Sequence, residues 1–150
     1  MHISKSAGYA IHGLGYIITR NSEVPVQISE IAAKHQVSKT YLAKIFQQLA
    51  AARIVIGQRG AAGGYTLARL PKDITLLEIV EAVDGPIIKR HCCLGIDDCP
   101  VQKKCPVLDI FLESSKRLGD YLRSITLEDA LRRYRDLKAP WLFQSLSGQQ

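Results

Sequence analysis

The chain has 150 residues, of which 47% are hydrophobic and 23% are charged. This length and composition fit one globular domain, or a small domain with an appended dimerisation arm, and they exclude extensive disorder. Twenty lysines and arginines against 14 aspartates and glutamates give a formal charge of +6. A basic chain favours an anionic partner, although the charge alone does not identify one.

The basic surplus lies entirely in the first half of the chain. Residues 1–72 contain nine basic and two acidic residues, whereas residues 73–150 contain 11 basic and 12 acidic residues. A basic module followed by a neutral one is typical of a nucleic-acid-binding domain with a second, different region. A solvated basic face is the alternative explanation of the same asymmetry.

No apolar run reaches the roughly 18 residues that a membrane span needs. The longest uncharged stretch, Ser6 to Thr19, lacks the small-residue cleavage pattern of a secretory signal and fits an amphipathic helix instead. All four cysteines fall between Cys92 and Cys105, which is not how disulfides staple a secreted domain. We therefore expect a cytoplasmic protein with a local metal or redox site.

The first half predicts a helix-turn-helix followed by a β-hairpin. A helix over 6–19 precedes a turn at 21–25, a short helix over 28–35, and a third helix that Ser38 caps and that runs to about Ala52. The helical period then stops, and 54–56 and 65–67 are predicted strands around a glycine-rich tip. This order is typical of a winged helix, in which the third helix enters the DNA major groove.

The second half predicts three further helices, with a cysteine-bearing loop before the second of them. Thr75 to Glu78 form a capping box that begins a helix ending near Asp84, Pro106 begins the longest helix, and Thr126 caps the last one. The fold class is therefore mainly α with a small β-hairpin wing. We expect a DNA-binding domain at 1–72, a linker helix, cysteine loop and dimerisation helices at 73–139, and a flexible tail at 140–150.

The longest predicted helix carries an apolar seam. Its members recur at alternating steps of three and four, a spacing typical of a helix that pairs with another helix; they are Leu108, Phe111, Ser115, Leu118, Leu122 and Ile125. A symmetric homodimer is the expected use of this seam, and packing onto the chain's own domain is the alternative.

The third helix and the wing tip carry the candidate residues for double-stranded DNA. Hydroxyl groups and positive charge gather at the helix start, where the backbone N–H groups also favour phosphate. Arg59 at the wing tip suits a narrow minor groove, where the potential is most negative. The candidate DNA-binding residues are Ser38, Lys39, Thr40, Tyr41, Lys44, Arg59 and Gly60.

The cysteine loop is the second candidate site. Cys93, Cys99 and Cys105 are equally spaced, with five residues between neighbours, among glycine, proline and polar residues. Structural zinc draws its cysteines in closer pairs, so zinc fits this spacing poorly. Iron–sulfur clusters accept more varied spacings, and a thiol switch is a further alternative because lysines and arginines flank the loop. The carboxylates are scattered and form no acid–base pair, which disfavours an enzyme.

Together, the helix-turn-helix, the wing string from Arg59 to Arg69, the three spaced cysteines and the long helix ending in Ile125-Thr126-Leu127 resemble the bacterial Rrf2 family. The resemblance covers nearly the whole chain. It implies a homodimeric winged-helix transcription factor whose DNA binding is controlled by an iron–sulfur cluster, of the 2Fe-2S or 4Fe-4S type. By this resemblance Cys93, Cys99 and Cys105 are the cluster ligands, and Ser38, Thr40, Tyr41 and Arg59 occupy DNA-reading positions.

The resemblance does not supply the fourth cluster ligand. IscR-like members carry a histidine where this chain has Leu108, and NsrR-like members can use an aspartate where it has Gly8. We favour His12 of the partner subunit or Cys92, with local alternatives in His91, Asp97 and Asp98 and a further one in an open iron site. Ala43 stands where IscR carries a base-selecting glutamate, so the operator sequence does not transfer. A cluster-free thiol or zinc regulator and a protein-binding adaptor remain the alternative functions.

Overall fold

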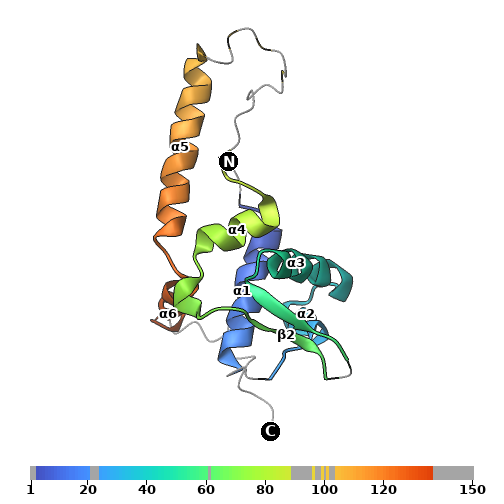
Figure 1. Cartoon of the computed structure of the whole chain (residues 1–150). Helices are drawn as coiled ribbons and strands as arrows, with labels where there is room; N and C mark the ends of the chain where they lie inside the picture. Colours follow the sequence, from blue (N-terminus) through green and yellow to red (C-terminus); the bar gives the residue numbers. More distant parts are fainter. Residues whose placement is uncertain are drawn as a thin grey trace.

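The computed structural model describes residues 3–20, 24–60, 62–88, 96, 99, 101 and 104–136. These residues form six α-helices, one short 3₁₀ turn and a two-stranded antiparallel sheet, which confirms the predicted fold class of a winged helix with added helices (Figure 1). In chain order the elements are α1 (Lys5–Thr19), α2 (Ile28–His35), α3 (Lys39–Ala51), β1 (Val55–Gln58), β2 (Gly64–Leu67), η1 (Pro71–Asp73), α4 (Leu76–Asp84), α5 (Pro106–Arg123) and α6 (Leu127–Asp136). The predicted tail at 140–150 lies outside the described residues.

Helix α1 lies at the centre of the fold and contacts α2, α3, α4, α6 and β2 (Figure 1). Gly13 of α1 faces the ring of Phe46 in α3, and a Cβ atom added at Gly13 would lie 2.9 Å from two carbons of that ring. Phe46 is fully buried, and its ring also packs against Tyr65 of β2. One hydrophobic cluster joins these residues to Ile79 of α4 and Leu131 of α6, so the first 72 residues share their core with the second half.

The helix-turn-helix is built as the sequence predicts. Ser38 caps α3 by accepting a hydrogen bond from the backbone N–H of Tyr41 at 3.1 Å. The tight link between α2 and α3 depends on Gln36, which adopts the left-handed conformation at φ 52° and donates its N–H to the last turn of α2. This conformation, which glycine usually adopts, sets the angle between the two helices.

The hairpin differs from the prediction in its bounds. Both strands extend toward the tip, because Gly57 pairs with Tyr65 and Gln58 with Gly64. Gly57, Gln58 and Gly64 were expected in the loop, and β1 begins at Val55 rather than at Ile54. Gly60 at the tip adopts φ 110°, a conformation that side chains disfavour. Gly64 lies so close to the strand-like segment before α2 that a Cβ atom would meet the carbonyl oxygen of Val26 at 2.5 Å. The tip is therefore shorter and more constrained than a flexible loop.

Two capping boxes lie side by side where α4 and α6 begin. Thr75 accepts from the N–H of Glu78 and Glu78 accepts from the N–H of Thr75, and Thr126 and Asp129 repeat the arrangement. A β-bridge joins Thr75 to Thr126. Hydrogen bonds from Thr126 lower the pKa of Asp129. Burial alone would raise the pKa of Glu78, but hydrogen bonds from Thr75 and Arg69, together with the charge of Arg69, outweigh it and lower that pKa. The junction holds the end of α5 against the core.

Replacing Thr75 with alanine removes the hydroxyl that caps α4. We expect the free energy of unfolding to fall by about 1 kcal/mol, the usual cost of losing such a cap, because the N–H of Glu78 loses its acceptor. Denaturant titration with circular dichroism measures the change. Thr75→Ser keeps the hydroxyl and is the control, and equal stability of the two variants would contradict the role of the cap.

Helix α5 extends away from the rest of the molecule (Figure 1). Leu122 is buried and Leu118 partly buried, and both pack with residues of α1 and α4. The second half of the predicted seam therefore packs against the chain's own core, which was the alternative to a dimer contact. The described residues include no helix with the length and apolar character of a membrane span.

The exposed apolar side chains of α5 lie on a different face from most of the seam. They are Val107, Ile110, Phe111 and Tyr121, and only Phe111 among them belongs to the seam that spacing predicts. Leu108, also in the seam, is buried at 3% exposure. The spacing identified a two-sided apolar helix but not which side packs internally.

Candidate nucleic-acid interface

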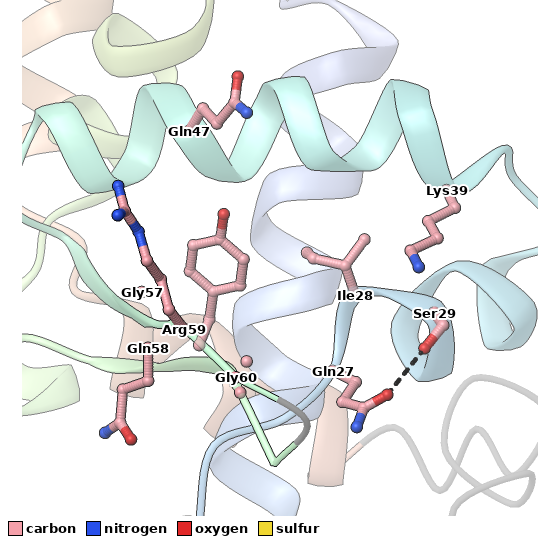
Figure 2. Close-up of a pocket in the computed structure, with 12 residues that line it drawn as sticks. Gln27, Ile28, Ser29, Lys39, Gln47, Gly57, Gln58, Arg59 and Gly60 are labelled. Carbon is pink, nitrogen blue, oxygen red and sulfur yellow. Dashed lines mark hydrogen bonds between the residues drawn. The ribbon is translucent and has the colours of Figure 1, made fainter.

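A groove runs between α3, the start of α2 and the hairpin. It has a volume of about 510 Å³, and Figure 2 shows Lys39 and Arg59 among the side chains that line it. Gln27, Ser29, Gln47 and Gln58 add amides and a hydroxyl, with Ser29 donating to Gln27 at 3.3 Å. The lining residues include two cations and no carboxylate, so the groove suits an anion with hydrogen-bonding edges.

A second groove flanks the other side of α3, against α1 and α4. Its volume is about 560 Å³, and Ser6, Tyr41, Lys44 and Gln47 are among its lining residues, again without a carboxylate. The Tyr41 and Ser6 hydroxyls are hydrogen-bonded at 2.6 Å. The ring of Tyr41 also packs edge-on against Tyr9, with centroids 6.0 Å apart. Helix α1 thus fixes the position of the Tyr41 hydroxyl.

The basic residues of the first half divide into paired and unpaired groups. Arg20 and Arg69 form ion pairs with Glu30 and Glu78, so these two arginines serve the fold. Lys39, Lys44 and Arg59 are exposed, and none of them has an ion-pair partner among the described residues. Their charge remains available to a ligand.

The structure brings some of the predicted DNA-binding residues together and separates others. Lys39 lines the same groove as Arg59 and Gly60, whereas Tyr41 and Lys44 line the other groove. Ser38 and Thr40 are exposed at the start of α3 between them. All seven predicted positions are therefore on or beside α3 and the wing.

Sequence reasoning missed several lining residues. Gln47 lies on the same face of α3 as Lys39 and Ala43, at i+8 and i+4 from them. This spacing is visible in the sequence and could have identified Gln47. Gln27 and Ser29 line the groove only because the start of α2 lies beside the hairpin. Local sequence patterns do not predict this tertiary contact.

The described part of the cysteine loop contains two of the three predicted cluster ligands. Cys99 and Cys105 are free thiols and both are partly buried, and Cys105 occupies the N-cap position of α5. Cys92 and Cys93 lie outside the described residues, as do His91, Asp97 and Asp98. No group of three metal-ligating His, Cys, Asp or Glu side chains occurs within the described part of the chain. The two thiols that are described match the donors that iron–sulfur clusters take.

His12 packs inside its own chain. Its ring centroid lies 5.8 Å from that of His35 in α2 and 5.6 Å from that of Tyr134 in α6. Burial lowers the pKa of both histidines, and the charges of His12 and Lys34 lower the pKa of His35 further. Both shifts favour the neutral form of the imidazole, the form that binds metals.

The helix-turn-helix, the glycine-rich hairpin and the two carboxylate-free grooves define a winged-helix DNA-binding protein. The chain belongs to the Rrf2 family of transcriptional regulators, because the family model described as an iron-dependent transcriptional regulator matches residues 3–133. An Rrf2-like HTH-type regulator of Rhodobacter capsulatus is 33% identical over 117 residues, which cover 75% of this chain and 78% of the relative. IscR of Pectobacterium carotovorum is 26% identical over 129 residues, covering 86% and 78% of the two chains.

Solved structures agree with this assignment. CymR, the global cysteine regulator of B. subtilis, superimposes with a TM-score of 0.69 at 26% identity, covering 89% of this chain and 98% of CymR. IscR of T. potens gives a TM-score of 0.65 at 27% identity, covering 89% of this chain and 88% of IscR. The family and these relatives are regulators of transcription rather than enzymes, as the scattered carboxylates predict.

Proposed function

We propose that this chain is a homodimeric transcription factor that reads operator DNA with α3 and the wing and whose DNA affinity depends on an iron–sulfur cluster in the cysteine loop. The observation that carries the DNA-binding part is the pair of grooves beside α3: one is lined by Lys39 and Arg59, the other by Lys44, and neither is lined by a carboxylate. A ridge between two cationic grooves matches a duplex, whose major groove lies between two phosphate backbones. Such a regulator works beside the chromosome, in the cytoplasm.

Each predicted DNA-binding residue has a distinct task in this arrangement. Lys39 and Lys44, on opposite sides of α3, neutralise phosphates of the two strands. Thr40 and the capped start of α3 at Ser38 reach the floor of the major groove or the nearest phosphate. Arg59 follows the wing toward the minor groove, and Gly60 allows the backbone to approach the duplex. Tyr41, held by Ser6, presents a fixed hydroxyl to a phosphate.

The second copy of the chain covers the exposed apolar face of α5. Val107, Ile110, Phe111 and Tyr121 are each about half exposed or more, between 48% and 66%, which a solitary helix would leave in water. Pairing α5 with its symmetry mate buries this face and places two α3 helices on successive turns of the duplex. The two half-sites are then centred about 34–36 Å apart.

Cys93, Cys99 and Cys105 are the proposed cluster ligands, with Cys92 or His12 of the partner subunit as the fourth. Support comes from the free, partly buried thiols of Cys99 and Cys105 and from the similarity to IscR. When bound, a cluster supplies an iron centre that responds to oxidants and to iron supply. The chain's own residues hold it and transmit the change in its state.

A continuous set of contacts leads from the end of α4, where the cysteine-bearing segment begins, to α3. Asp84, the last residue of α4, accepts hydrogen bonds from the backbone N–H and the hydroxyl of Ser4, the N-cap of α1. Two residues later Ser6 bonds Tyr41 of α3. A change in the cysteine loop that moves Asp84 thus reaches the DNA-contacting helix through the start of α1.

The alternative function is a cluster-free regulator that uses the thiols themselves or zinc. One observation favours it: Leu108, where IscR-like members carry a histidine ligand, is an apolar residue at 3% exposure. The structural similarity to CymR, named for cysteine regulation, points the same way. A winged helix that has become a protein-binding adaptor is a further alternative, and DNA binding tests it directly.

Arg59→Ala is expected to weaken binding to operator DNA about tenfold at low salt, because one cation leaves the groove beside α3. The slope of log affinity against log salt concentration should become shallower by about one. Fluorescence anisotropy with a duplex selected from a randomised library measures both quantities.

Lys72→Ala is the matched control, since it removes one exposed positive charge from η1, outside both grooves. It should leave the salt slope unchanged. If Arg59→Ala and Lys72→Ala bind equally well, the wing does not contact DNA. If the unmodified chain shows no salt-dependent binding to any duplex, the adaptor function replaces the regulator.

A further inference from the structure

The exposed carboxamide of Gln47 on α3 has no hydrogen-bond partner among the residues that the structure describes. Gln47 lines the groove on the wing side and also the groove on the α1 side, so it stands on the ridge between them (Figure 2). It is exposed and makes no hydrogen bond among the described residues. A side chain on this ridge points away from the body of the protein.

The neighbouring glutamine shows the contrast. Gln48 donates a hydrogen bond from its Nε2 to the carbonyl oxygen of Val83 in α4, at 3.4 Å. Its amide is thus committed to the contact between α3 and α4. The same residue type therefore has a structural partner at 48 and none at 47.

The other two side chains on the same face of α3 as Gln47 are the charged Lys39 and the short Ala43. Lys39, Ala43 and Gln47 follow one another at i, i+4 and i+8, with Gln47 about 12 Å along the helix from Lys39. The methyl group of Ala43 between them leaves space for a base edge to approach. Lys39 carries charge but no acceptor, so Gln47 alone in this row presents a donor and an acceptor in one plane.

We propose that Gln47 is a specificity-determining residue that reads an A·T pair in the operator half-site. A carboxamide can donate to N7 of adenine and accept from its N6 amino group at the same time. Guanine offers two acceptors at the same place, so the carbonyl oxygen of Gln47 would face an acceptor. This inference rests on the proposed DNA-binding function and adds which base the ridge selects.

The test selects duplexes from a randomised library with the purified full-length chain and with the Gln47→Ala variant. Alanine is a strong helix former and Gln47 is exposed, so the variant should fold, which circular dichroism checks. The unmodified chain should prefer A·T at one position of each half-site. Replacing that pair by G·C should weaken its binding about fivefold to 150-fold, and should change the affinity of Gln47→Ala by less than twofold.

Gln48→Ala is the matched control, because it removes the same amide from the adjacent position. It should keep the full A·T preference, whatever it does to stability. An unchanged preference in Gln47→Ala would overturn the proposal, as would the absence of an A·T position in the unmodified chain. Failure of the unmodified chain to bind any duplex would instead overturn the DNA-binding function itself.

Discussion

Replacing Cys99 or Cys105 with serine is expected to abolish retention of an iron–sulfur cluster. After anaerobic purification or reconstitution with iron and sulfide, the unmodified chain should be coloured and contain iron and acid-labile sulfide. In each variant both should fall to background, because a hydroxyl is a poor ligand for iron compared with a thiolate and the substitution removes one of the three proposed cysteine ligands. Absorption spectra with iron and sulfide analysis measure the loss.

Val101→Ser is the control for this experiment. Val101 lies between the two cysteines in sequence and is 59% exposed, so the variant adds a serine to the same segment without removing a thiol. It should retain the cluster. A colourless unmodified chain that stays free of iron after reconstitution would eliminate the cluster and leave the thiol or zinc regulator, which metal analysis and oxidant treatment separate.

The fourth ligand is assigned with two further variants, Cys92→Ser and His12→Ala. The variant whose cluster changes its absorption spectrum or its stability to oxygen identifies the ligand. His12 is a demanding ligand because its ring packs against His35 and Tyr134 of its own chain, so ligation would require that ring to leave those neighbours. An unchanged cluster in both variants would indicate an iron open to solvent or to a small effector.

Phe111→Glu combined with Ile110→Glu is expected to convert the proposed dimer into a monomer. These side chains are 48% and 66% exposed in the single chain, and burying two carboxylates in a helix–helix contact is strongly unfavourable. The mass in solution should fall from twice 16.6 kDa to 16.6 kDa, as light scattering would show. Operator affinity should fall about 100-fold to 10,000-fold, because each α3 then binds its half-site without a tethered partner.

Lys116→Glu serves as the control on the same helix. Lys116 is exposed and lies about 140° around α5 from Phe111, so its substitution introduces the same charge on another face. It should leave the mass and the operator affinity unchanged. A double variant that remains dimeric would place the contact between subunits elsewhere on the molecule.

The local chemistry of helix ends was predictable from sequence. Ser38 caps α3, Thr75 and Glu78 form a capping box, and Pro106 begins α5, all as the residue types indicate. These features depend on hydrogen bonds within four residues, so the sequence contains all the information they need.

Features that depend on tertiary packing were less predictable. Gln36 and Arg53 adopt left-handed backbone conformations that sequence patterns assign to glycine. Only part of the predicted apolar seam of α5 packs inside the chain, because Leu118 and Leu122 contact α1 and α4. The spacing of apolar residues along α5 cannot predict which of them make these contacts. Gln47 entered the candidate site only when the two grooves showed that it stands between them.

The absence of one carbon atom at Gly13 determines how far α3 can approach α1. A methyl group there would lie 2.9 Å from the ring of Phe46, and that ring cannot turn aside, because it is fully buried and packs on Tyr65. The helix that carries Gln47 would have to lift or roll instead. If α3 reads DNA as proposed, the volume of the residue at position 13 sets the angle at which α3 enters the groove, and a substitution there would change operator preference without altering a proposed DNA-contacting residue.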